Sequence, residues 1–447
     1  MKRFCLRFGG TAPGRMLAFA VVAGASLLSG CGDDGILARL LLKPGHIIVE
    51  TRPDAAYEKL FPYYVELCAG SQFRAKLTGE GGLAGHAVMY LKGACKDDDA
   101  PYPQLRRCGR VATSLDDPEH GAGISVNRWF KSVNWVAIPG YRLFFDGNLA
   151  PGERLTRRQF DAVEQAAIDQ GIYKGVTFHR YPGAQSDTDL HEFLKRDGIG
   201  TDFAMQFARS MFCARLPVTG QMLDQIIAFL NDKNREYAEG EADYNWSVWA
   251  DNCMHTLRNA LAAANIWSPL SVRAIKIMQI FNLAIPANEF VNLARLMTAP
   301  IDTYREIMED GPRRDAFHEF HWLPTEPGAL VKTLPVHAPN DLYDTTFRLF
   351  TLQSPFLMGK TQRAVDILSN PRFVDLAANL HSYDKQYDAI LGGYDERRDT
   401  MASVRGTPFR RVERLFYRYI RAQRDRVRSM LARLATTAGS AAAPAAN

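Results

Sequence analysis

The chain of 447 residues is 47% hydrophobic and 23% charged, which is ordinary for a globular protein. Its formal net charge of +5 is too small to indicate a nucleic-acid-binding protein. No zinc-finger spacing and no aromatic-basic RNA-binding motif is present, so no nucleic-acid partner is expected.

The first 30 residues have the organisation of a secretion signal. Lys2 and Arg3 precede a short apolar core at 17–28, and a membrane span needs about 20 apolar residues. Leu28-Ser29-Gly30-Cys31 resembles the lipobox of bacterial lipoproteins, in which the cysteine is lipidated and becomes the mature N-terminus. The resemblance implies a membrane anchor at Cys31 and, because Gly32 rather than aspartate follows, a periplasm-facing position on the outer membrane. The alternative is an ordinary signal peptide or an inner-membrane anchor.

Cysteines after the anchor are odd in number, which matters in an oxidising periplasm. If the others bridge internally, at least one thiol stays unpaired. Cys95 and Cys108 flank a polar loop that a disulfide could hold shut, and the helix-start position of Cys253 singles it out as the unpaired one. The five are Cys68, Cys95, Cys108, Cys213 and Cys253.

The hydrophobic period changes from strand-like to helix-like along residues 63–268. Helices are expected after the strands, which is typical of an α+β domain. The expected strands are 63–73, 83–91, 121–130, 133–139 and 141–145. The expected helices are 156–167, 203–212, 220–234 and the one that begins at Cys253.

Residues 269–434 are expected to form a mainly α-helical domain. Its helices are predicted at 273–283, 288–297, 303–308, 342–352, 361–368, 373–391 and 409–434. A proline-rich stretch at 320–340 is expected to be an extended connection, and Gly392-Gly393 to break a helix. Outside the two domains we expect a lipid anchor and tether at 31–62 and a disordered tail at 435–447.

The last expected helix, 409–434, carries nine arginines against only Glu413 and Asp425. Such a helix could lie on anionic phospholipid or lipopolysaccharide. The alternative is a solvated face of a helix that packs on its own domain.

The segment 244–267 holds the main candidate for chemistry. Asp251 and Asn252 favour a helix N-cap, which places Cys253 in the first turn, where free N–H groups and the helix dipole lower a thiol pKa. The alternative is a buried cysteine that only fills space. His86, at the start of an expected apolar strand, could take the thiol proton if folding brings the two together. Taken alone, such a histidine is usually a core residue.

A Gly-His before an apolar strand, further strands, and then Asn-Cys at a helix start resembles the circularly permuted papain-like thiol enzymes of the NlpC type. The spacing is most similar to that of the periplasmic domain of bacterial lipoprotein acyltransferases. The similar segments include Leu155-Thr156-Arg157-Arg158-Gln159-Phe160 and Tyr244-Asn245. The resemblance covers about half of the chain and implies Cys253 as the nucleophile and His86 as the base.

The same resemblance implies a polar residue on a later strand that orients the imidazole. Ser125, Asn127 and Asn134 qualify, as does Glu80 in a glycine-rich turn, and we favour Asn127. The backbone N–H of Cys253, with Asn252 or Asn245, would form an oxyanion site. His255 lies on another helix face and cannot easily act as the base.

No metal or organic cofactor is implied. His318 and His321 are three residues apart, without the four-residue spacing of zinc proteases and without a third ligand. The sequence therefore predicts a lipid-anchored envelope protein with thiol-dependent acyl transfer or hydrolysis on a lipid ester, a lipoprotein or a peptidoglycan amide. The competing hypothesis is a non-catalytic envelope lipoprotein that binds lipid or partner proteins.

Overall fold

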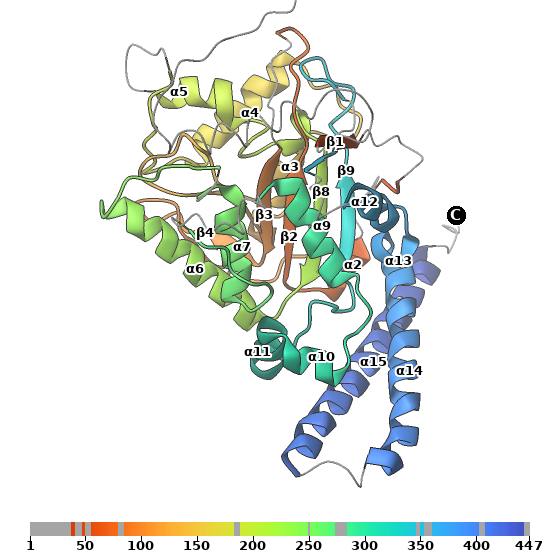
Figure 1. Ribbon diagram of the computed structural model, residues 1–447. Coiled ribbons are helices and arrows are strands. Elements are labelled where there is room, and N and C mark those ends of the chain that lie inside the picture. The colour runs from red at the N-terminus through yellow and green to blue at the C-terminus, as the bar shows by residue number, and fades with distance from the viewer. Residues whose placement is uncertain are drawn as a thin grey trace, which may run out of the picture.

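The computed structural model describes residues 37–40, 47–49, 55–78, 85–182, 188–248, 251–272, 284–345, 349–352, 360–401 and 407–441. The expected signal segment with Cys31, Glu80 and the helix expected at 273–283 lie outside these residues. A six-stranded antiparallel sheet with helices packed around it forms the body, and the C-terminal region is mainly helical (Figure 1). The predicted α+β class is confirmed.

The central sheet has the strand order β7-β6-β3-β2-β8-β9, with every pair antiparallel. Its strands are β2 (Tyr64–Gly70), β3 (His86–Lys92), β6 (Gly121–Ser125), β7 (Val136–Pro139), β8 (Met211–Pro217) and β9 (Leu330–Leu334). The edge strand β9 comes from the stretch expected to be an extended connection. The sheet therefore crosses the domain boundary expected at 268/269, although the later residues are mainly helical, as predicted.

One face of the sheet is apolar and lies under helices. Leu67, Met89 and Ile124 share this face because register partners project to the same side. The ring of Phe212 on it meets Phe290 of α9 (Pro286–Met297), which crosses in front of β2 and β8 in Figure 1. Burying each large apolar side chain here contributes about 1.5–3 kcal/mol.

Two further helices complete this layer. The first is α7 (Cys253–Ala263), which packs on β3, and the second is α6 (Gly220–Ala238), which packs on α7. Both helices were predicted from the 3–4 spacing of their apolar residues. The first turn of α7 therefore lies against the sheet rather than in solvent.

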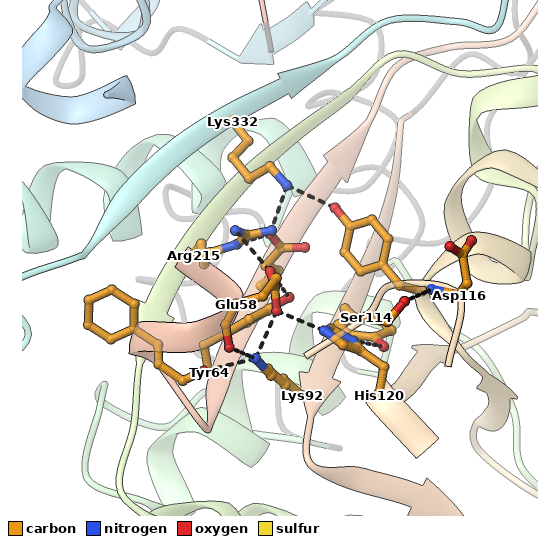
Figure 2. A network of polar contacts seen from close by, with 12 residues as sticks. Glu58, Tyr64, Lys92, Ser114, Asp116, His120, Arg215 and Lys332 are labelled. Atoms are coloured by element: carbon orange, nitrogen blue, oxygen red, sulfur yellow. Dashed lines mark hydrogen bonds and ion pairs between the residues drawn. The ribbon is translucent and has the colours of Figure 1, made fainter. Parts of the chain in front are cut away.

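The opposite face of the sheet carries buried charges (Figure 2). Glu66 lies opposite Arg215 in the strand register, and Arg215 donates to it through Nε. Lys332 of β9 lies 3.4 Å from Glu66. All three side chains are at most 5% exposed.

Glu58 closes this network from α2 (Ala55–Leu60), a helix inside the segment expected to be a tether. Its carboxylate accepts hydrogen bonds from Lys92 Nζ at 2.8 Å and from Tyr64 OH at 3.1 Å, and His120 Nε2 lies 2.7 Å away. Burial raises the pKa of Glu58, but the hydrogen bond with His120 and the charges of Arg215 and Lys92 outweigh it and hold the pKa far below its usual range. Residues 55–60 are therefore part of the core, and the expectation of a tether reaching 62 is wrong.

Three expected elements have a different structure. The stretch 141–145 forms the helix α3 (Tyr141–Asp146), and 203–212 forms a short 3₁₀ turn (Met205–Phe207) that leads into β8. Residues expected as a helix at 342–352 include the strand β10 (Leu349–Leu352), which pairs with β1 (Leu37–Leu40). Continuous apolar or mixed runs lack a period that distinguishes buried helix from buried strand.

Smaller elements surround the sheet. The strands β4 (Ala94–Lys96) and β5 (Leu105–Arg107) pair as a ribbon closed by the Cys95–Cys108 disulfide. The remaining helices are α4 (Arg157–Asp169), α5 (Leu190–Phe193), α10 (Tyr304–Glu309), α11 (Gly311–Phe320), α12 (Lys360–Leu368) and α13 (Pro371–Val374). Short turns of helix lie at Pro118–His120 and Leu194–Gly198.

The two longest helices, α14 (Leu376–Met401) and α15 (Thr407–Ala441), form a hairpin that extends beyond the body (Figure 1). Gly392 and Gly393 lie within α14, so they do not break the helix, and α15 continues past the start of the expected tail. Arg428 of α15 pairs with Asp384 at 2.7 Å and with Asp388 at 2.6 Å. Part of the arginine-rich surface is therefore neutralised within the chain. No helix among the described residues combines the length and apolarity that a membrane crossing requires.

Candidate functional site

The N-terminus of α7 is capped by Asn252, as its sequence position predicts. Asn252 Oδ1 accepts hydrogen bonds from the N–H of Met254 at 2.8 Å and of His255 at 3.3 Å. Its amide nitrogen donates to the carbonyl oxygens of Val248 and Ala284. Because these bonds engage the side chain, Asn252 is a structural cap and has no free donor for an oxyanion.

The other residues suggested around the cysteine lie apart from it. Asn245 is exposed and donates to the carbonyl of Asp243. The ring of His255 completes the capping box of α7 and is buried, so it serves the helix start. Burial, with Arg258 adding to it, lowers the pKa of His255 to about 4.

Cys253 is the free thiol among the described cysteines. The other four form the disulfides Cys68–Cys213 and Cys95–Cys108. The backbone of Ala87 hydrogen-bonds the Cys253 sulfur, which places the thiol at the start of β3, next to His86. Cys253 is 6% exposed.

Burial raises the pKa of the Cys253 thiol above its usual value. Backbone N–H groups of Ala87, Met254 and Cys253, and the charge of Arg209, act in the opposite direction but are weaker. The lowering expected from the helix start is therefore wrong in its net direction, because the sheet excludes water from the first turn of α7. The resting side chain is a neutral thiol.

His86 is tied to a chain of polar side chains that ends at Asp202. His86 Nε2 lies 3.0 Å from Ser125 Oγ, and Ser125 donates to Asp202 Oδ1 at 2.8 Å. Asn127 does not contact the imidazole; its amide donates to both oxygens of Asp202 at 3.2 Å. Ser125 is therefore the side chain that contacts the ring, whereas Asn127 contacts only Asp202, the next member of the chain.

Asp202 is fully buried and has a strongly perturbed carboxyl group. Burial raises its pKa to about 7, although Ser125, Asn127 and Tyr173 all donate hydrogen bonds to it and oppose the shift. Burial also lowers the pKa of His86 to about 3, and the charge of Arg209 adds to this. The imidazole is therefore neutral near pH 7, and the same shift makes it a weak base in this structure.

Among the described residues no hydrogen bond joins Cys253 Sγ to the His86 ring. The sulfur instead contacts the backbone of the residue after the histidine. Hydrogen bonds between catalytic groups often form only when substrate is bound, so the separation does not by itself exclude a pair. Asn134 is not near the ring; it accepts a hydrogen bond from Thr256 of α7 at 2.8 Å.

Asp202 and Arg209 were not predicted from the sequence. Asp202 ends the run Gly198-Ile199-Gly200-Thr201-Asp202, in which two glycines signal a tight turn but not a buried carboxylate. Arg209 precedes an apolar run and gives no signal of its burial at 5% exposure. Only the fold brings either residue to His86.

Two hollows on the described part of the chain lie elsewhere. One, of about 640 Å³, is lined by residues that include Lys96, Arg142 and Lys174. The other, of about 510 Å³, includes Trp267 and Arg295. Cys253 and His86 line neither. Within the same residues, no three His, Cys, Asp or Glu side chains are grouped to hold a metal ion.

Comparison with known proteins gives no match: no family model, no curated protein and no solved structure is significantly similar to the chain. The resemblance to permuted papain-like thiol enzymes therefore stays a prediction that depends on the residues themselves.

Proposed function

We propose that the chain is an envelope lipoprotein with a permuted papain-like domain that carries out thiol-dependent acyl transfer or hydrolysis. One observation carries the proposal. The free thiol of Cys253, at the start of α7, is bonded to the backbone of Ala87, the residue after His86. The His86 ring projects with Ser125 to the sheet face opposite Met89 and Ile124, and it is linked through Ser125 to Asp202.

The hydrogen bonds from His86 through Ser125 to Asp202 suggest which nitrogen of the His86 ring would act as the base. With Asp202 ionised, the Ser125 hydroxyl donates to it, so Ser125 Oγ accepts the Nε2–H of His86. A ring N–H of His86 also donates to the backbone carbonyl of Thr201, and the ring nitrogen left unprotonated is the atom that takes the thiol proton. Ser125 and Asp202 are positioning residues, since they act through His86.

The reaction then proceeds in two halves. His86 removes the proton of Cys253, the sulfur bonds to the acyl carbon, and the carbonyl electron pair moves to oxygen, next to the backbone N–H of Cys253. When the carbonyl re-forms, the bond to the leaving oxygen or nitrogen breaks, and that atom takes the proton from His86. Water or an acceptor amine or hydroxyl attacks the thioester carbon, and its proton passes to His86. The carbon–sulfur bond then breaks, and the sulfur takes the proton back from His86 as the thiol.

The candidate substrates are a lipid ester, a lipoprotein N-terminus and a peptidoglycan amide, each of which lies where a lipid on Cys31 would hold the protein. Contact of the 409–434 helix with anionic lipid is part of the same proposal. A second candidate, a non-catalytic envelope lipoprotein that binds lipid or partner proteins, is favoured by the burial of Cys253 and the raised pKa of its thiol.

Acyl-enzyme trapping tests the enzyme hypothesis. The purified protein is incubated with a 4-nitrophenyl acyl ester, and nitrophenol release and the mass of the cysteine peptides are followed. We expect an acyl adduct on Cys253 that is lost in Cys253→Ser and strongly reduced in His86→Ala. His318→Ala, which removes a histidine remote in sequence from the site, is the matched control and should acylate normally. Absence of an adduct in the natural protein would favour the binding hypothesis.

A further inference from the structure

The side chain of Arg209 packs over Gly70, the residue of β2 that is paired with His86. Gly70 is the register partner of His86, and a Cβ on Gly70 would lie 3.1 Å from Arg209 Cδ and 3.5 Å from the carbonyl oxygen of His86. The arginine side chain therefore occupies the space that a side chain at position 70 would fill. This places Arg209 on the opposite side of His86 from Ser125, because β2 and β6 flank β3.

The guanidinium is buried without a carboxylate partner among the described residues. Its Nε donates to the carbonyl of Gly200 at 2.7 Å, its Nη1 to that of Ser71 at 2.7 Å and its Nη2 to Thr201 Oγ1 at 3.4 Å. A guanidinium carries five N–H donors, and these contacts use three of them, all with neutral oxygens. Two donors are left for another group, and Asp197 and Asp202 act on the charge without a hydrogen bond to the guanidinium among the described residues.

Burying a charged guanidinium without a carboxylate partner costs folding free energy unless another group compensates the charge. Burial lowers the pKa of Arg209 to about 10, which leaves it charged at neutral pH. The other buried arginine of the sheet, Arg215, differs in this respect because it is paired with Glu66. Phe73 covers one side of the Arg209 guanidinium, with its centroid 4.9 Å from Cζ. Arginine is well suited to bind carboxylate or phosphate groups through parallel hydrogen bonds.

We propose that Arg209 binds an anionic group of the acyl substrate, a carboxylate or a phosphate placed close to the carbonyl that Cys253 attacks. The inference rests on the proposed function, since it concerns the same thiol. It narrows the substrate class to anionic acyl compounds and makes neutral esters the poorer substrates.

Alkylation by a pair of nearly isosteric reagents tests the charge directly. Iodoacetate and iodoacetamide both form a bond from sulfur to carbon with loss of iodide, and no oxyanion develops, so a difference between them reports on binding of the carboxylate. We expect Cys253 to react with iodoacetate faster, relative to iodoacetamide, than N-acetylcysteine does. In Arg209→Met this ratio should fall by about tenfold, the effect of one lost charge-assisted hydrogen bond. Arg209→Lys should retain part of the preference, and Arg74→Met, at an exposed arginine near Phe73, should retain all of it.

A protection experiment on the natural protein makes the test independent of whether the variants fold. Acetate or inorganic phosphate should slow labelling of Cys253 by iodoacetamide when compared with chloride at equal ionic strength. Protection by acetate alone indicates a carboxylate substrate, and protection by phosphate alone indicates a phosphate ester, and either result supports the proposal. If Cys253 reacts in a His86-dependent manner but shows neither preference nor protection, the anion site is refuted and the thiol chemistry stands. If Cys253 reacts with neither reagent, both proposals fail.

Discussion

The buried ion network around Glu58 makes a quantitative prediction about stability. Lys92, Arg215 and Lys332 are cationic side chains that share the network with only two carboxylates, Glu58 and Glu66. Glu58→Gln would keep the volume and leave three cations with one carboxylate in a region at most 5% exposed. Removing one partner of a buried ion pair costs about 3–5 kcal/mol, so we expect the free energy of unfolding to fall by that amount at pH 7.

The direction in which the pKa of Glu58 is shifted determines how the loss in the free energy of unfolding depends on pH. The pKa of Glu58 is lowered in the folded state from a usual value of 4.5. The carboxylate therefore stabilises the fold above pH 4.5, and its contribution is lost as the pH falls below that value. The difference between the natural protein and Glu58→Gln should be largest near neutral pH and should shrink on acidification.

Urea unfolding followed by tryptophan fluorescence measures both effects. The matched control is Asp341→Asn, which removes an exposed ion pair with Arg154 and should cost no more than about 1 kcal/mol. A second change, Lys92→Met in the Glu58→Gln background, should cost less than the same change alone, since the two residues are coupled. A loss below about 1 kcal/mol for Glu58→Gln at pH 7, or a loss that does not shrink as the pH falls well below 4.5, would refute the assignment of a charged network.

Four further outcomes are expected. The rate of Cys253 labelling should show an inflection near pH 7, where Asp202 titrates and its bond to Ser125 changes, and Asp202→Asn should remove the inflection; a profile unchanged in that variant contradicts the relay. The same raised pKa makes Asp202 lower stability as the pH rises from 3.8 to about 7, so Asp202→Asn should flatten the pH dependence of the melting temperature over that range. Removing the Cys68–Cys213 bridge, which spans 145 residues, should cost about 5 kcal/mol, against about 3 kcal/mol for Cys95–Cys108 with 13, as measured by denaturation of the Cys→Ala pairs; equal losses would contradict the loop-closure argument. Gly392→Ala should raise the melting temperature, because an added Cβ meets nothing within 4 Å and alanine stabilises a helix interior by about 1 kcal/mol over glycine.

Periodic elements were predictable from the sequence. The apolar residues of α6 and α7 recur at helical spacing, and Asn252 signals the start of α7, so helix and cap follow from local chemistry. The strands β2, β3, β6 and β7 follow from short apolar runs bounded by glycine and proline. The segment 141–145 was misassigned because its aromatic residues favour strands locally, whereas burial of nearly the whole segment allows a helix.

Long-range partners were not predictable in the same way. Ser125 and Asn127 were both candidates for the group beside His86, and only the strand register places Ser125 against the ring. Asp202 is separated from Ser125 by 77 residues and reaches it through a turn with no periodic pattern. The thiol pKa depends on how closely α7 packs on the sheet, which is a property of the tertiary structure rather than of the helix start.

The position of β9 at the edge of the sheet has a consequence for how the chain is made. β8 has its β9-facing edge unpaired until residues 330–334 have been synthesised, more than a hundred residues later. An unpaired strand edge is a template for aggregation, and pairing between distant segments is slow. A nascent or truncated chain that ends near residue 268 would present this edge to its neighbours. The strand order therefore predicts that a chaperone would protect this edge during synthesis and that expression trials should retain residues 330–334.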